Sequence, residues 1–390
     1  MSLFKKQKYD NESPGRLAWR RFRRNMPAMV ALGYVVVLCV VALFAYLIIP
    51  DKSPDANTMC LPIAVKPPGF KAKMLVMHKD MGITESRSPL QKVFGGFEPY
   101  DFYTPVDTVF TKERTLMVYE YTGDKNVVSL KKYTREDLNQ SRLSIDNQQA
   151  ILLKGERPPV RHVTFLLGTD RYGRDMLSRL ILGARVSMLV GIVAVIISLI
   201  IGVTLGAIAG YFGGWIDSLI QWFINVIWAI PTILLVIAVS IALGKGFMQV
   251  FIAVGLTMWV EVARLVRGQV LSLRQMEFVE ASKALGFSHW RAIFVHILPN
   301  MSGPLAVVAA SNFASAILIE AGLSFIGFGV QPPTASWGTM IRDHYGYIIL
   351  DNAYLAVLPG LAIVSVVLAF IMLGNGLRDA MDVKGVADRA

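Results

Sequence analysis

The stretch MLVGIVAVIISLIIGVTLGAIAG, residues Met188–Gly210, contains no charged side chain. A helix needs about 20 consecutive apolar residues to cross the hydrocarbon layer of a bilayer, so this stretch predicts a transmembrane helix. The whole chain has a matching composition, because 54% of its 390 residues are hydrophobic and its mean hydropathy is +0.49. One soluble core would not bury that much apolar surface, and the sequence therefore predicts a membrane protein.

Five other stretches complete the predicted set of spans. Four carry no charge, whereas the fifth, Phe247–Ala263, is free of charge up to Val260 and then reaches Glu261. The four uncharged stretches are Ala28–Ile49, Ser218–Gly244, Met301–Ile319 and Asn352–Leu377. We therefore expect an all-α polytopic membrane protein with six transmembrane helices, the first of which covers residues 27–49.

Lysine and arginine are concentrated near the ends of these spans. Because basic residues favour the cytoplasmic side of short loops, we expect residues 1–26, the loop 272–299 and the tail 378–390 to be cytoplasmic. These flanks account for the net charge of +11. Since the loops carry no stripe of basic and aromatic residues, we expect no nucleic acid among the partners.

Residues 50–165 are more polar than the rest and contain several prolines. Within them, Thr115–Tyr121 and Val127–Tyr133 are rich in strand-forming residues and are joined by TGDKN, a pattern that predicts a β-hairpin. We expect a small extracytoplasmic insert, containing β-structure, between helices 1 and 2. Two roles stay open for it: a docking surface or lid for a soluble partner, or packing alone.

The stretch LGTDRYGRDMLSRLILGARVS, Leu167–Ser187, mixes acidic and basic side chains just before the second span. Its charges include Asp170, Arg174, Asp175 and Arg179, and from Arg174 onward apolar residues recur at helical spacing. This pattern predicts an amphipathic helix at the outer membrane surface. Salt-bridged packing at the interface is favoured over substrate contact as the role of these charges.

The segment EASKALGFSHWRAIFVHILPN, Glu280–Asn300, is polar although it lies between two predicted spans. A helix over Glu277–Leu285 is expected to end at Gly286 in a left-handed cap, and Ser288 is expected to cap a second helix. Pro299 should end the second helix, because proline cannot continue the hydrogen-bond ladder. The residues expected to share an apolar face are Phe278, Ala281 and Leu285 in the first helix and Trp290, Ile293, Phe294 and Ile297 in the second.

The residues alone leave two interpretations of this helix pair. It is either a rigid knuckle that passes a displacement from a cytoplasmic partner into two transmembrane helices, or a hairpin that lies on the lipid headgroups.

The order of Glu-Ala-Ser, Gly and Leu-Pro in this loop resembles the EAA loop of bacterial ATP-binding-cassette (ABC) importer permeases. Three further stretches resemble the C-type permease of the dipeptide, oligopeptide and nickel subfamily, and the likeness covers the first span and residues 166–382. These stretches are GTDRYGRD, ARLVRGQVL (Ala263–Leu271) and EAGLSFIGFGVQPPTASWG (Glu320–Gly338). The matching residues of the loop are Glu280, Ala281, Ser282, Gly286, Leu298 and Pro299.

This resemblance implies an importer of the bacterial cytoplasmic (inner) membrane. Residues 166–377 would be the permease domain, which pairs with a second homologous permease as a heterodimer and contacts membrane lipid. Two cytoplasmic ABC ATPase subunits would bind the EAA loop, and an extracytoplasmic substrate-binding protein would deliver the solute. ATP and Mg would bind the ATPases, so this chain would be no enzyme and would hold no cofactor or metal; it also carries no phosphate-binding P-loop.

Several assignments remain open. Glu320 either contacts a peptide amine in transit or pairs with the second permease, whereas Glu261 is expected to pair with Arg264 one turn further on. Trp222 and Asn225 stand where relatives commonly show Arg and Asp, which makes Asn225 a candidate for the pathway or the subunit contact. The expected substrate is peptide, and the alternative is nickel or another small solute. An ion-coupled secondary carrier is the competing class, but such a carrier commonly has two related halves, and no repeat is visible here.

Overall fold

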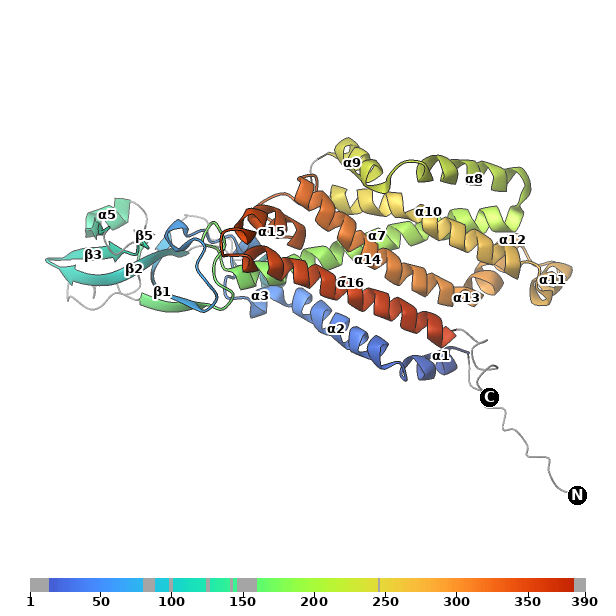
Figure 1. The fold of residues 1–390 in the computed structure, drawn as a ribbon, viewed down its shortest axis with the longest axis horizontal. Coiled ribbons are helices and arrows are strands. Elements are labelled where there is room, and N and C mark those ends of the chain that lie inside the picture. The colour runs from blue at the N-terminus through green and yellow to red at the C-terminus, as the bar shows by residue number, and fades with distance from the viewer. Residues whose placement is uncertain are drawn as a thin grey trace, which may run out of the picture. The chain divides into compact units, whose positions relative to one another are not determined.

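The computed structural model describes residues 14–79, 88–97, 101–123, 127–140, 143–145, 160–244 and 246–381 (Figure 1). The chain divides into two compact units. The first unit comprises Met1–Val37, Leu189–Glu320 and Ile363–Ala390, and the second comprises Leu38–Met188 and Ala321–Ala362.

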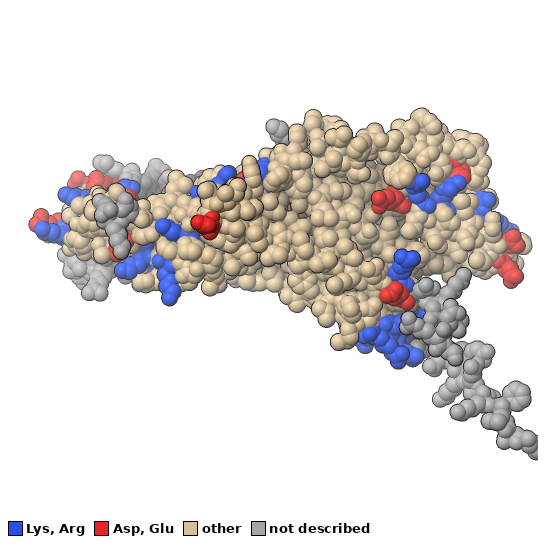
Figure 2. All heavy atoms as spheres, viewed as in Figure 1, with Lys and Arg blue, Asp and Glu red and all other residues tan. Residues whose placement is uncertain are grey.

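Five helices in the described part of the chain are long and apolar enough to cross a membrane. A sixth candidate is a broken pair, α8 (Gly214–Trp228) and α9 (Thr232–Leu243), whose axes differ by 93°. The five are α2 (Met26–Leu43), α7 (Met176–Phe212), α10 (Phe247–Leu273), α14 (Ser302–Ile326) and α16 (Tyr354–Met381). In Figure 2 charged side chains are sparse on the surface that faces the viewer over these helices. The predicted class, a mostly helical polytopic membrane protein, is confirmed.

Two predicted spans are interrupted in the structure. The stretch Ser218–Gly244 is not one straight helix, because the chain bends after Trp228 and Pro231 cannot donate a backbone hydrogen bond across the break. The first span is interrupted at Phe44, after which α3 (Ala45–Ile48) forms a separate turn. By contrast, the stretch that meets Glu261 is one continuous helix of 27 residues.

Helix α7 is longer than the predicted span Met188–Gly210. It contains 37 residues, which at 1.5 Å per residue gives a length of about 55 Å. The hydrocarbon core is about 30 Å thick, so the amphipathic segment expected before the span is the beginning of the same helix.

Three glycines bring α7 against α10 in the first unit. A Cβ added at Gly206 would lie 2.5 Å from the carbonyl oxygen of Ala263, and one added at Gly202 would lie 2.5 Å from the Cβ of Val262. Gly210 makes the same kind of approach one turn further on. Small residues four positions apart let two membrane helices approach closely, and the valines of α10 that face this stripe are fully buried.

A six-stranded antiparallel sheet lies within residues 50–165 of the second unit, in the order β4-β3-β2-β1-β5, with β6 also paired to β1. The predicted hairpin is β3 and β4, in which Leu116 pairs with Tyr133 and Glu120 with Ser129. The central strands β1 and β2 were not predicted. The strands are β1 (Phe70–Lys79), β2 (Asp101–Lys112), β3 (Thr115–Glu120), β4 (Ser129–Tyr133), β5 (Leu143–Ser144) and β6 (Val160–Phe165).

The short elements connect these larger ones. The helices are α1 (Pro14–Phe22), α4 (Pro89–Gly95), α5 (Arg135–Gln140), α11 (Glu277–Ala284), α12 (His289–Arg291), η3 (Ala292–Ile297), α13 (Leu298–Asn300) and α15 (Trp337–His344), and the 3₁₀ turns are η1 (Pro54–Ala56), η2 (Leu61–Ile63) and η4 (Tyr345–Ile348).

Candidate functional site

The loop between α10 and α14 begins with a short helix that stops where the sequence predicts. Gly286 has φ +76, and its N–H donates to the carbonyl of Lys283 at 2.9 Å. The N–H of Phe287 donates to the carbonyl of Ser282 at 3.1 Å. This pair of bonds is a Schellman cap, which requires a residue that tolerates the left-handed conformation. Gly286 therefore sets the turn between α11 and the next helix.

Ser288 caps the second helix of the loop, since its hydroxyl accepts from the N–H of Arg291 at 3.4 Å. The following six residues, Ala292–Ile297, form a π-helix. Helical geometry then continues through Pro299 to Asn300, so the prediction that Pro299 ends this helix is wrong by one residue. The N–H of Leu298 donates to the carbonyl of Ile293, five residues back, and this wider winding accommodates a proline that cannot form the usual bond.

Phe278, Ala281 and Leu285 are all exposed, which agrees with the prediction that they share one side of α11, but the predicted face of the second helix is divided. In α11, Val279 and Ser282 are buried, whereas the apolar side chains of Phe278 and Leu285 are exposed. In the second helix, Ile293 and Ile297 are buried, but Trp290 and Phe294 are exposed and their rings stack at 6.1 Å. The π-helix explains this split, because i, i+3, i+4 and i+7 share one face only at 3.6 residues per turn.

The loop is fastened to the end of α7. The guanidinium of Arg274 donates to the carbonyls of Gly210 and Tyr211, at 3.2 and 3.1 Å. The Tyr211 hydroxyl lies 3.1 Å from Nδ1 of His289, and Val279, Ile293 and Ile297 are buried in one cluster with residues of α7 and α10. This anchor was not predicted from the sequence, because nothing local relates Arg274 to a helix end 63 residues away. The loop therefore packs as part of the first unit.

The residues matched by the EAA resemblance take different positions on this loop. Glu280, Ala281 and Gly286 are exposed, whereas Ser282 is buried and donates its hydroxyl to the carbonyl of Val279 at 2.7 Å. Leu298 is half-buried and Pro299 is exposed. We use the name α11–α12 surface for these exposed members together with the exposed side chains of Phe278, Leu285, Trp290 and Phe294.

The expected pair of Glu261 and Arg264 is not an ion pair among the described residues. Arg264 instead lies over the ring of Trp228, 4.0 Å from its centroid. One turn further along α10, Arg267 forms a bidentate pair with Asp217 of α8, at 2.5 and 2.7 Å. The prediction for Glu261 was wrong because the break after Trp228 brings an aromatic ring to Arg264, and no local pattern signals that contact.

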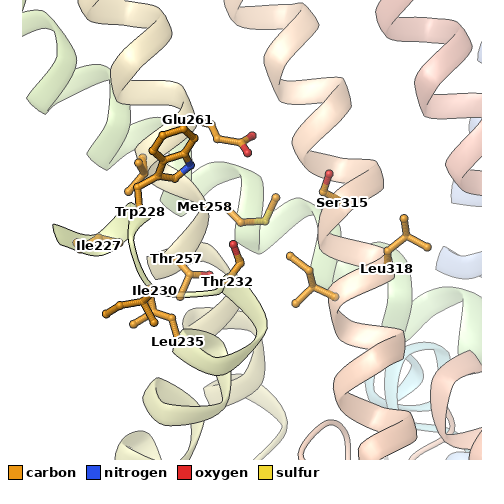
Figure 3. Close-up of a pocket in the computed structure, with 12 residues that line it drawn as sticks. Ile227, Trp228, Ile230, Thr232, Leu235, Thr257, Met258, Glu261, Ser315 and Leu318 are labelled. Carbon is orange, nitrogen blue, oxygen red and sulfur yellow. The ribbon is translucent and has the colours of Figure 1, made fainter. Parts of the chain in front are cut away.

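Glu261 lines a pocket of about 340 Å³ at the break between α8 and α9 (Figure 3). In Figure 3 its carboxylate extends from α10 toward Ser315 of α14, beside the ring of Trp228. The other lining residues, which are mostly apolar, are Ile227, Ile230, Thr232, Leu235, Thr257, Met258, Val260, Leu318 and Ile319. We call this the Glu261 pocket.

The three residues considered for the pathway do not converge on one site. Glu320 is fully buried on α14, and Asn225 is exposed on α8. Neither lines the Glu261 pocket. Of the three, Glu261 is the residue that lines the pocket described above.

The charged segment before α7 is a tight turn in the second unit. The Asp170 carboxylate accepts from Nε of Arg174 at 2.6 Å and from the backbone of Tyr172 and Arg174, and both charged side chains are almost fully buried. Arg179 lies 3.8 Å from the same carboxylate. Asp175 precedes α7 and accepts from the backbone of Ser178 at 2.8 Å, and burial raises the pKa of its carboxyl group. Ion pairing and helix capping thus hold this turn together.

Two family models match the chain. Residues 202–384 match the model described as "Binding-protein-dependent transport system inner membrane component". Residues 13–63 match the "N-terminal TM domain of oligopeptide transport permease C".

Three curated relatives agree with these models. The di/tripeptide transport system permease protein DppC of Pseudomonas aeruginosa is 45% identical over 56% of this chain and 72% of its own length. The oligopeptide transport system permease protein OppC of Bacillus subtilis is 40% identical over 60% of this chain and 75% of its own length. The glutathione transport system permease protein GsiD of Pectobacterium atrosepticum is 41% identical over 56% and 72%.

Proposed function

The chain belongs to the family of binding-protein-dependent transport system inner membrane components, and on this premise we propose that it carries small peptides across the bacterial inner membrane. It is a C-type permease subunit of an ABC importer, a membrane component rather than an enzyme, and it works in a complex with other permease and ATPase subunits. The names of its relatives support peptide as the substrate class.

The proposed assembly has one second permease as the heterodimeric partner, two ATPase subunits and an extracytoplasmic substrate-binding protein. ATP and Mg bind the ATPases, and both termini of this chain are cytoplasmic. The basic residues near the ends of α1 and α10 support this orientation.

The α11–α12 surface is the proposed ATPase contact. It includes four exposed apolar side chains that a partner would cover, namely Phe278, Leu285, Trp290 and Phe294. The loop beneath is fixed to α7 through Arg274 and His289. A displacement of this surface is therefore transmitted to α7, α10 and α14, which pack with the loop in one buried cluster. Nucleotide-driven closure of the ATPases would tilt these helices and open the pathway outward, and hydrolysis would reverse the change.

The observation that carries the proposal is the Gly286 turn, because it sets the angle between the two loop helices. We expect Gly286→Pro to abolish peptide uptake while the protein still inserts, since proline cannot adopt φ +76 and would lose the bond to Lys283. Gly286→Asn is the matched control, because asparagine tolerates this conformation and a Cβ there meets no atom within 4 Å.

The measurements are uptake of a labelled dipeptide by cells and the amount of the variant in the membrane fraction. Loss of uptake by the proline variant, with uptake retained by the asparagine variant, supports the proposal. Normal uptake by the proline variant would contradict it.

A further inference from the structure

We infer that the Glu261 pocket is a binding site for the protonated amino terminus of a peptide in transit, with the Glu261 carboxylate as the group that contacts the ammonium. This inference rests on the proposed function and adds to it the part of the substrate that the permease itself recognises. It also separates Glu261 from Glu320, since Glu320 does not line the pocket.

The first step is the charge of the pocket. Glu261 is the one ionisable residue in its lining. The two arginines that follow on α10 are both engaged elsewhere: Arg264 lies on the ring of Trp228 at 4.0 Å, and Arg267 is held by Asp217 through two hydrogen bonds. Among the described residues, no ion pair reaches Glu261. The pocket therefore presents a carboxylate that forms no ion pair with a described residue.

The second step is the surroundings of that charge. Ile227, Ile230, Leu235 and Met258 form an apolar wall around the cavity. The Glu261 side chain is exposed, so a cation that enters the pocket can reach its carboxylate. Trp228 also lies next to the carboxylate and adds apolar surface, while Arg264 already covers a face of its ring. The combination suits an organic ammonium ion whose remainder is partly apolar.

The third step is size and position. Pockets of about 300–1,000 Å³ commonly bind small organic ligands, and the Glu261 pocket, at about 340 Å³, has room for a short peptide end. It lies where α8 gives way to α9, and binding sites of membrane transporters are commonly formed at interrupted helices. Ser315 and Thr232 supply hydroxyl groups at the pocket for the peptide backbone. Every peptide has an amino terminus, so recognition of this group serves many sequences.

The test uses the transporter purified with its partner subunits in detergent, without the substrate-binding protein. Isothermal titration with trialanine measures affinity, and N-acetyltrialanine is the probe that lacks the ammonium. Because hydrogen bonds to charged groups contribute about 1.5–3 kcal/mol, we expect Glu261→Gln and N-acetylation each to weaken binding about tenfold or more. The Glu261→Gln variant should bind N-acetyltrialanine no more weakly than it binds trialanine. Glu261→Asp should restore most of the affinity.

Glu113→Gln is the matched control, since Glu113 is an exposed carboxylate in the turn between β2 and β3. Equal affinity of the wild type for both probes, or equal affinity of the Glu261→Gln variant and the wild type for trialanine, would overturn the inference. If Gly286→Pro still abolishes peptide uptake in that case, the proposed function stands although the inference about Glu261 does not. If the Gly286→Pro variant takes up peptide normally, the proposed function itself is contradicted.

Discussion

The carboxylate of Asp217 accepts two hydrogen bonds from the guanidinium of Arg267, at 2.5 and 2.7 Å, and this pair ties α8 to α10. Both side chains are less than one third exposed. A bidentate arginine–carboxylate pair fixes geometry as well as adding energy. Around it, Ile224, Trp259 and Ala263 form the apolar contact between the same two helices.

We expect Asp217→Asn to lower the free energy of unfolding by about 1–3 kcal/mol, because it weakens a hydrogen bond between charged groups. The measurement is thermal unfolding of the purified protein in detergent. A double-mutant cycle with Arg267→Gln isolates the pair. If the two substitutions were additive in this cycle, the pair would not couple α8 to α10.

The glycine stripe of α7 gives a second prediction. Gly206→Ala should destabilise the protein by about 1–3 kcal/mol, since overpacking forces backbone or side-chain shifts and the new Cβ would lie 2.5 Å from the carbonyl oxygen of Ala263. Gly268→Ala on α10 is the matched control, because a Cβ there meets no atom within 4 Å. That control should leave stability unchanged or raise it by up to about 1 kcal/mol. Equal melting temperatures for the two variants would show that the stripe is not a close contact.

The turn before α7 gives a third prediction. Asp170→Ala should cost about 3–5 kcal/mol, because it leaves the charge of the buried Arg174 without its partner and removes the acceptor for two backbone N–H groups. The double variant with Arg174→Met should recover part of this loss, since the buried charge of Arg174 is then removed as well and only that of Arg179 stays without Asp170. Chemical denaturation followed by circular dichroism measures both. A double variant as unstable as the single one would point to the backbone bonds, rather than the charge, as the main contribution.

Signals carried within one segment predicted most of the fold. The apolar runs located every span, the positive-φ glycine located the end of α11, and Ser288 located the next helix start. The hairpin of β3 and β4 followed from strand-forming residues on either side of a turn. Each of these features depends on a few neighbouring residues, so no distant contact was needed to infer it.

Features that depend on contacts between distant segments were missed. The break after Trp228 lies in an apolar run that is long enough for one straight helix, and only Pro231 signals it locally. The burial of Ile293 and Ile297 without Trp290 depends on a π-helix, which periodicity at 3.6 residues does not detect. Gly202, Gly206 and Gly210 stand four positions apart in the sequence. No local pattern relates these glycines to the valines of α10 that they contact.

The sharp turn at Ala229–Pro231 also constrains which side of the subunit meets lipid. Hydrocarbon chains supply neither donors nor acceptors, so a main chain that leaves helical geometry at membrane depth survives only against protein or water. This portion of the surface must therefore be turned toward a neighbouring subunit or a hydrated channel. A spin label at Ala229 should accordingly be shielded from lipid-soluble oxygen, whereas one at Leu361 of α16, which is exposed, should collide with it freely.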